Sequence, residues 1–582
     1  MARRTTALLL PLLLGAGAAA AQQPADPRVG LKAGWHDAGQ AIRNLNLVAH
    51  RDRPEGFFNT ANMGDFGFLN ADMAFKGNLL FLGGFNGFQV WDISNPANPT
   101  LRVTHVCPGG QGDVSIIRNL LFVSVEETRG RTDCGGQGIQ DSVSADRFRG
   151  VRIFDITDLQ HPRQITTVQT CRGSHTHTLV PDPRDPSAVY IYVSGTAPVR
   201  SPSELTGCSG RSPDQDPNTS LFRIEVIRVP LDRPQDARVV STPRIFANRQ
   251  TGAIGGLWQG GAHGQGTQTT ATTNQCHDIT VYPEMGLAAG ACAGNGILLD
   301  IRDPANPVRI DEVSDPNFAY WHSATFNNDA SKVLFSDEWG GGTQARCRAT
   351  DPPLWGSDAI FTLGSNRKLS PGGYFKLPAP QTAEENCVAH NGSIIPVPGR
   401  DIMVQAWYQG GISVFDFTDA AHPKEIAFFD RGPMGPQLVL SGFWSAYWYN
   451  GHIYGSEIGR GLDVFTLAPS EFLSQNEIDA ARLVRMELFN PQDQTKITWP
   501  ASFVVARAYL DQLVRGHALA PARTDRIASE LRRLERVSAA ATRRTGLRTL
   551  AAQVAGYAAS SADAPRVRML AGAIRDLAGA GR

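Results

Sequence analysis

Short runs of β-branched and aromatic residues recur between residues 45 and 467, and most end in a polar turn that contains proline. The clearest copy is FQVWDISNPANP at residues 88–99, with close matches at residues 151–162, 297–307 and 412–423. Weaker copies lie at residues 224–234, 359–364 and 462–469. Each copy is typical of a strand and its exit turn. Seven copies, spaced by roughly 50–70 residues, predict units of the size of a propeller blade.

A hairpin pattern precedes the repeated strand in each unit. Residues 72–75 and 79–82 flank one tight turn, and residues 113–116 and 120–123 flank another. The proline turn then leads to an outer strand, such as residues 101–106. Four antiparallel strands, repeated about seven times, predict an all-β fold: a seven-bladed β-propeller over residues 22–467.

The last unit has no outer strand of its own, because helical sequence follows Leu467. Residues 45–50 have the pattern of an outer strand, so we expect them to pair with residues 462–467 and close the ring. Residues 468–582 change to a helical period rich in Ala, Leu and Arg, which predicts an α-helical C-terminal extension. The expected helices are residues 470–488, with Ser470 as cap, and residues 501–514, 524–537 and 566–577.

Long insertions fall on one face of the predicted propeller, the face where each inner strand begins. They occupy residues 128–148, 195–220, 247–275, 340–358 and 364–386. All eight cysteines lie in or beside segments at this face. Disulfides are favoured over a thiolate metal site, because the cysteine count is even and no pair has CxxC spacing. We expect the pairs Cys276–Cys292 and Cys347–Cys387, and the sequence leaves the other connections open.

Four histidines stand at the start of the inner strands of four successive units: His177, His277, His322 and His390. Inner strands line the channel, so these imidazoles are expected to converge at its mouth. Neutral imidazole is the commonest side-chain metal ligand and suits copper, iron or zinc. The alternative is a set of polar residues that hydrogen-bond neighbouring blades around a water-filled channel. Outside this register, five histidines are interpreted as loop or surface residues: His105, His161, His175, His263 and His452.

Carboxylates reach the same face. Glu126, Glu338 and Glu457 end the second strands of three units, and Asp278 directly follows His277. Carboxylates can orient a ligating imidazole or bind the metal themselves. Glu338 and Asp278 are therefore the candidate catalytic residues. Four tryptophans are candidates for a ligand pocket, although core packing is the commoner role of such side chains: Trp321, Trp339, Trp407 and Trp444.

The N-terminus has the pattern of a secretory signal over residues 1–21. Arg3 and Arg4 precede a short apolar run at residues 8–14, and alanine-rich sequence follows. The run is too short to cross a bilayer. We therefore expect a secreted or periplasmic protein without a transmembrane segment. The formal net charge is zero, so nothing global points to nucleic acid, and we expect a monomer.

The repeated phrase of residues 88–99 resembles the LVIVD-repeat family of secreted bacterial propellers, over roughly residues 45–467. The resemblance implies the propeller architecture and no particular reaction. The channel-facing histidines are also similar, more distantly, to those of selenium-binding proteins, which include methanethiol oxidases. In those propellers histidines are thought to hold copper, so this likeness implies an oxidase only by analogy.

Two functions remain open from the sequence. The first is a metal-dependent oxidoreductase, with a transition metal on His177, His277, His322 and His390 and a small-molecule substrate at the looped mouth. The second is a secreted scaffold without chemistry that binds a protein or glycan through the same loops. The histidine register favours the first, because a pure scaffold does not need it.

Overall fold

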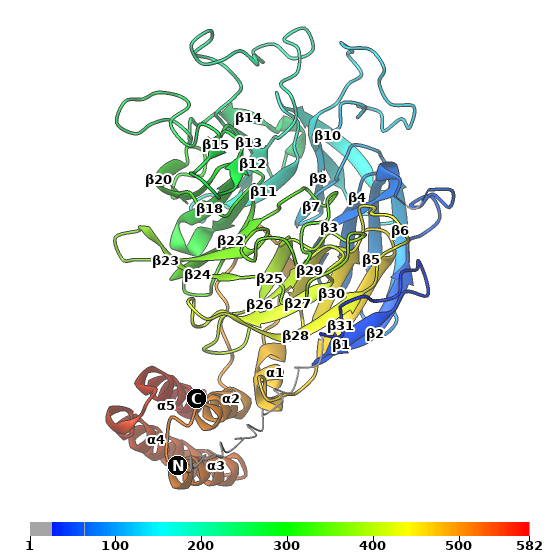
Figure 1. Ribbon diagram of the computed structural model, residues 1–582. Coiled ribbons are helices and arrows are strands. Elements are labelled where there is room, and N and C mark those ends of the chain that lie inside the picture. The colour runs from blue at the N-terminus through cyan, green and yellow to red at the C-terminus, as the bar shows by residue number, and fades with distance from the viewer. Residues whose placement is uncertain (1–25, 63, 581–582) are drawn as a thin grey trace, which may run out of the picture.

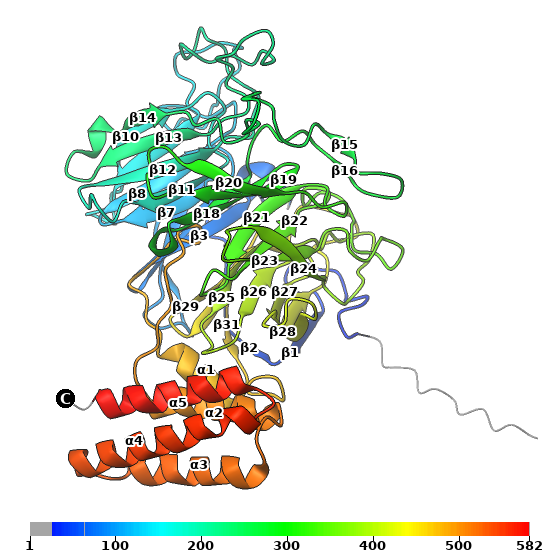
Figure 2. The ribbon, with the colours of Figure 1, turned by 90° about the vertical axis from the view of Figure 1, so that its left-hand side faces the viewer.

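The computed structural model describes residues 26–62 and 64–580 (Figure 1). The predicted signal peptide lies outside the described residues. Strands dominate residues 40–467, and α-helices occupy residues 475–579. Both views show the helices gathered at one end of the molecule, with the first of them against the sheets (Figures 1 and 2).

Antiparallel four-stranded sheets follow one another along the first part of the chain. The first contains β3 (Asn70–Lys76), β4 (Leu79–Gly84), β5 (Gly87–Asp92) and β6 (Thr100–Val106). The second contains β7 (Val114–Ile117), β8 (Leu120–Val125), β9 (Gly150–Asp155) and β10 (Arg163–Gln169). The third contains β11 (Thr176–Pro181), β12 (Ala188–Ser194), β13 (Glu225–Pro230) and β14 (Arg238–Ser241).

The same order of strands continues in the rest of the β region. The fourth sheet contains β17 (Asp278–Tyr282), β18 (Leu287–Cys292), β19 (Asn295–Asp300) and β20 (Val308–Val313). The next contains β21 (Trp321–Phe326), β22 (Lys332–Asp337), β23 (Asp358–Leu363) and β24 (Leu369–Phe375). β15 (Gly261–Ala262) and β16 (Thr269–Thr270) form a small hairpin within an insertion.

A nine-stranded sheet joins the last two units. One half contains β25 (Asn391–Ile395), β26 (Ile402–Ala406), β27 (Ile412–Asp416) and β28 (Lys424–Arg431), with β1 (Gln40–Arg43) added at its edge. The other half contains β29 (Phe443–Tyr449), β30 (His452–Glu457), β31 (Gly461–Leu467) and β2 (Leu45–Asp52). The succession of four-stranded antiparallel sheets, with the first strand of each buried throughout or nearly so, is that of a β-propeller.

The repeated phrase forms the third strand of its sheet, as expected, and its aspartate makes the exit turn. Asp92 Oδ1 accepts a hydrogen bond from the Ser94 amide at 2.9 Å. Asp155 holds Thr157 in the same way at 2.9 Å, and Asp416 holds Thr418 at 2.8 Å. An aspartate that bonds the backbone two residues ahead stabilises a turn. The recurrent Asp of the phrase therefore ends one strand and redirects the chain to the next.

The N-terminal strand closes the ring, as the sequence predicts. β2 pairs with β31 antiparallel, with Leu45 opposite Leu467 and Asp52 opposite Gly461. Leu45 is buried in the core of the two last units. The pairing gives β31 an outer neighbouring strand, which the chain that directly follows β31 does not supply.

The C-terminal extension is helical, with different boundaries from those expected. It contains α1 (Gln475–Arg482), α2 (Phe503–Arg515), α3 (Pro521–Glu535), α4 (Ala540–Gly556) and α5 (Ala564–Gly579). The expected cap Ser470 is wrong: Ser474 caps α1, in a capping box with Glu477. The expected helix to residue 488 is also wrong, because the chain leaves α1 after Arg482 and becomes extended. α4 has no counterpart in the sequence prediction.

The extended chain between α1 and α2, residues 487–499, crosses the ends of the inner strands. These ends lie opposite the mouth of the channel at which the histidines are predicted to meet. β32 (Leu488–Phe489) pairs with the end of β3. Asn490 then bonds the backbone of Ile116 at the end of β7, and Gln494 bonds Phe326 at the end of β21. Trp499 finally donates its indole N–H to the Pro396 carbonyl at 2.8 Å. The segment thus spans one end of the central channel.

The ring closure contains a pH-sensitive contact. His50 on β2 lies 2.7 Å from Asp463 Oδ1 on β31. Burial alone would lower the pKa of His50, and Arg431 also opposes its charge, but Asp463 and Asp52 together raise it above its ordinary value. Charged His50 therefore stabilises the fold fully below the ordinary histidine pKa, and this stabilisation is lost as pH rises through the raised value.

We expect His50→Gln to lower the free energy of unfolding more at pH 6 than at pH 9. The difference should stay below about 1 kcal/mol, because the ion pair is partly open to solvent. Urea unfolding of both proteins at the two pH values measures it, with the exposed His161→Gln as control. An equal effect of His50→Gln at both pH values would contradict the assignment.

Candidate metal centre

Four histidines from four successive sheets meet where the first strands begin. His175, His277 and His390 each directly precede such a strand, β11, β17 and β25 respectively. His322 is the second residue of β21, within a β-bulge that shifts the pairing with β22 between Trp321 and Ala324. A bulge re-aims the side chains that it contains. His322 therefore joins the other three from a different place in its strand.

The four imidazoles contact one another in a row. The Nε2 atoms of His175 and His277 lie 2.6 Å apart. The ring centres of His277 and His322 are 3.8 Å apart, and those of His322 and His390 are 4.1 Å apart. Two overlapping sets have their ligand atoms within 4.8 Å of one another: His277, Asp278 and His322, and then His322, Glu338 and His390.

Three ring nitrogens of this cluster are buried without a hydrogen-bond partner. They are Nδ1 and Nε2 of His322 and Nε2 of His390. His390 uses its other nitrogen, Nδ1, to donate to the Trp444 carbonyl. Its Nε2 therefore carries the lone pair that can bind a metal. Buried polar atoms without partners are costly, and a shared metal ion would satisfy these.

Burial keeps most of these imidazoles neutral. It lowers the pKa of His277 and His322 well below the ordinary value and that of His390 to about 3. Neutral imidazole is the form that binds metals. His175 differs: burial would lower its pKa, but the Glu126 carboxylate outweighs burial and raises it. The same pairing lowers the pKa of Glu126 to about 2 against its own burial.

Carboxylates hold two of the four histidines in place. Glu126 Oε2 lies 2.5 Å from His175 Nδ1. Asp278 Oδ1 lies 3.2 Å from His277 Nδ1. Such contacts fix the ring orientation of a metal-binding histidine and leave the opposite nitrogen for the ion. In both residues that opposite nitrogen is the Nε2 that faces the other histidine.

Glu338, the other predicted catalytic residue, lies beside the cluster. Its Oε2 is 3.8 Å from His322 Nε2, and its Oε1 accepts a hydrogen bond of 2.5 Å from the Tyr408 hydroxyl. Burial raises the pKa of Glu338 to about 7, although the Tyr408 hydrogen bond acts in the opposite direction. This carboxyl group can therefore hold or release a proton near neutral pH.

His177 stands apart from the cluster, in contrast to its predicted place. Its Nε2 lies 2.6 Å from the Ser115 hydroxyl and its Nδ1 lies 2.8 Å from that of Ser124. Both ring nitrogens are thus occupied inside the propeller. His175, interpreted from the sequence as a loop or surface residue, takes the position that the prediction gave to His177. The sequence signal that identifies His175 is its position directly before the inner strand, because His277 and His390 occupy the same position in their own units.

The other predicted polar and aromatic residues divide between site and core. Glu457 pairs with Arg460 and accepts from the Gly442 amide, away from the histidines. Trp321 and Trp407 are buried core residues. Trp444 does belong to the site, since its ring centre lies 4.9 Å from that of His390.

Four disulfides tie down the looped face. The predicted pairs Cys276–Cys292 and Cys347–Cys387 are confirmed, and Cys107–Cys134 and Cys171–Cys208 complete the set. His105 lies near Cys107 and Cys134, but their sulfurs are already joined to each other. That group is therefore no thiolate metal site.

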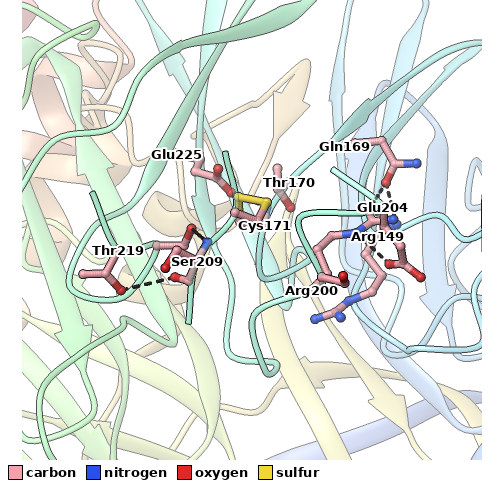
Figure 3. The surroundings of a disulfide bond; sticks show 12 residues. Arg149, Gln169, Thr170, Cys171, Arg200, Glu204, Ser209, Thr219 and Glu225 are labelled. Carbon is pink, nitrogen blue, oxygen red and sulfur yellow. Dashed lines mark hydrogen bonds and ion pairs between the residues drawn. A yellow bond between two sulfur atoms is a disulfide. The ribbon is translucent and has the colours of Figure 1, made fainter. Parts of the chain in front are cut away.

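The disulfide Cys171–Cys208 joins the middle of the insertion after β12 to the connection between β10 and β11 (Figure 3). Glu225 accepts from the Cys171 amide at 2.8 Å, and an Arg200–Glu204 ion pair lies in the same insertion. Thr196, at the start of the insertion, donates its amide to Glu126 at 3.0 Å. The pinned loop thereby helps to hold the carboxylate that supports His175.

Residues 70–105 match the family model described as the LVIVD repeat. The chain carries an LVIVD repeat. The matched LVIVD repeat extends from β3 into β6, so it covers almost all of the four consecutive strands of the first sheet, to which β32 adds a fifth. No curated protein sequence matches the chain.

Similar solved structures are distant. A protein from Lactobacillus plantarum has 12% identity and a TM-score of 0.40, over 61% of this chain and 83% of its own. The Kuenenia stuttgartiensis hydrazine synthase has 10% identity and a TM-score of 0.40, over 67% and 92%. The Pseudomonas aeruginosa periplasmic gluconolactonase has 11% identity and a TM-score of 0.38, over 69% and 96%. None of these likenesses carries a function to this chain.

The disulfide Cys276–Cys292 ties the residue before His277 to the end of β18, and Ala293 then bridges to Trp321 beside His322. We expect Cys276→Ser with Cys292→Ser to lower the free energy of unfolding by about 3 kcal/mol. The bond joins residues 16 positions apart, and this is the loss expected when a closed loop of that length is opened. The double substitution should also weaken metal binding. Removal of the disulfide Cys107–Cys134 is the matched control. It should lower the free energy of unfolding by a similar amount and leave the metal affinity unchanged. Chemical unfolding and calorimetric titration measure both, and equal metal affinity in the two variants would contradict this role.

Proposed function

We propose that the protein is a secreted or periplasmic seven-bladed β-propeller that holds a transition metal ion at one mouth of its channel. The observation that carries the proposal is the row of four contacting imidazoles that four successive sheets bring together. Among the described residues, three nitrogens of this row, on His322 and His390, are buried without a hydrogen-bond partner. The proposed ligands are His175, His277, His322 and His390. His175 replaces His177 because the latter is fully engaged by two serines.

The blade count rests on the strand order. Seven groups of four strands follow one another, if the nine-stranded sheet is divided between β25 and β29. β2 supplies the fourth strand of the last group. Residues 22–467 would then form the propeller and residues 468–582 an extension that covers one end of it.

The compartment follows from the cysteines. Four disulfides and no free cysteine among residues 26–580, Met63 aside, suit an oxidising compartment. Among the helices of these same residues, none has the length and apolar character that a bilayer crossing requires. The proposed signal peptide at residues 1–21 would direct export.

The donor set suits copper, iron or zinc, because imidazole with carboxylate is the preferred environment of these borderline ions. When bound, such an ion supplies a Lewis acid or, for copper and iron, a redox centre, and the proposed activity is that of an oxidoreductase on a small molecule. Asp278 orients His277 through its Nδ1. Glu338 accepts or returns a proton at its Oε2, and Tyr408 holds this carboxyl group in place.

The test is calorimetric titration of metal-stripped protein with copper, zinc and iron. Copper(II) is expected to bind most tightly of the divalent ions. His175→Ala and His322→Ala should each weaken binding at least about tenfold, the loss that even an outer partner of a ligand can cause. His177→Asn and the exposed His161→Ala should leave the affinity unchanged.

Metal binding should also raise the melting temperature, because the ion binds only the folded state. Two results would overturn the proposal: binding of all three ions as tightly by His322→Ala as by the unsubstituted protein, or no binding at all. The looped face would then be assigned to the alternative, a non-catalytic surface for a protein or glycan.

A further inference from the structure

A cavity of about 380 Å³ opens beside the histidine cluster. Three of its lining residues contact the proposed metal ligands: Glu126 holds His175, Glu338 lies 3.8 Å from His322, and Trp444 packs on His390. The cavity therefore ends at the proposed metal centre. Its volume suits a small molecule and lies at the lower end of the range for ligand pockets.

One wall of the cavity is a row of aromatic rings. Phe66, in a short 3-10 helix (Phe66–Phe68), lies at the outer rim with 52% of its surface exposed. Its ring centre is 6.4 Å from that of Phe85, which is 6.3 Å from that of Trp444. Trp444 leads to His390 at 4.9 Å. The row runs from solvent to a proposed ligand and offers edges and faces to a flat apolar group.

The charged side chains that line the cavity are acidic, and its other polar side chains are Gln111 and Tyr408. Glu126, Glu127 and Glu338 line it, and no lysine or arginine does so among the described residues. The charge of Glu126 is matched by His175. Glu127 is exposed, and no described ion pair involves it. The cavity thus attracts positive charge and disfavours anions such as carboxylates and phosphates.

We propose that this cavity binds a small aromatic amine, with the ring against Phe66, Phe85 and Trp444 and the ammonium group toward Glu127. The assignment deepens the proposed function, since it names the class of molecule that the metal site takes. The aromatic row supplies contact area and ring–ring attraction. The acidic side supplies the charge that separates an amine from a neutral or anionic molecule with the same ring.

The experiment compares four probes on metal-stripped full-length protein, by calorimetry and tryptophan fluorescence. 2-Phenylethylamine has both the aromatic ring and a positive charge, and 2-phenylethanol has the ring without a charge. Phenylacetate has the ring and a negative charge, and n-hexylamine has a positive charge without a ring. We expect 2-phenylethylamine to bind at least about fivefold more tightly than any other probe, the factor that about 1 kcal/mol of charge or ring attraction supplies. Its affinity should fall at high salt.

Two substitutions separate the contributions of ring and charge. Glu127→Gln should weaken 2-phenylethylamine about fivefold and leave 2-phenylethanol unchanged. Phe66→Ala should weaken both aromatic probes by a similar factor and leave n-hexylamine unchanged. The matched controls are Glu471→Gln and Leu101→Ala, both at exposed positions outside the cavity. Both controls should bind every probe as the unsubstituted protein does.

The cavity assignment is overturned if phenylacetate or 2-phenylethanol binds as tightly as the amine, if no probe binds, or if Glu127→Gln has no effect. The proposed function fails by a different result, the absence of metal binding. If metal titration fails while the amine binds as described, the metal proposal is wrong and the amine site stands. If metal binds and the amine does not, only the amine site is wrong.

Discussion

The closure of the ring depends on one strand pairing. The last unit has only β29, β30 and β31 from its own part of the chain, so β31 would keep an edge of unpaired N–H and C=O groups without a further strand. Here the further strand is β2, whose partner β31 comes from the opposite end of the β region. The contact between His50 and Asp463 joins residues 413 positions apart. That pairing joins the first strands of the β region to its last unit, and the remaining units lie between them along the chain.

The candidate site depends on the arrangement of the inner strands. Because the inner strands share an axis, the residues directly before them meet at one mouth of the channel. When several units have a histidine at that position, the histidines form a cluster. The loops on the same face are long, so they need additional restraint, which the disulfides provide. The cost of burying several imidazoles is offset only if their nitrogens find partners, which explains why carboxylates and a backbone carbonyl surround them.

Much of this was predictable from sequence. The phrase at residues 88–99 identifies the third strand and its turn because both depend on local chemistry: an apolar strand followed by an aspartate that bonds the next backbone amides. The choice of His177 over His175 failed because a shift of two residues preserves the face of a strand. Periodicity therefore cannot tell the residue at the mouth from one deeper in the channel. The bulge that turns His322 likewise leaves no mark in the pattern.

The extended segment between α1 and α2 crosses the end of the channel opposite the histidines. Gln492 reaches inward from it, with its side-chain nitrogen 3.3 Å from Asp72 Oδ2. In a channel that is open at both ends, a ligand can enter at one end and leave at the other. With this segment across one end, a ligand at the proposed histidine centre would leave through the looped mouth before the next one enters. The rate of departure is then set by the loops at that mouth, so that differences in loop length and sequence translate into differences in residence time while the centre itself stays unchanged.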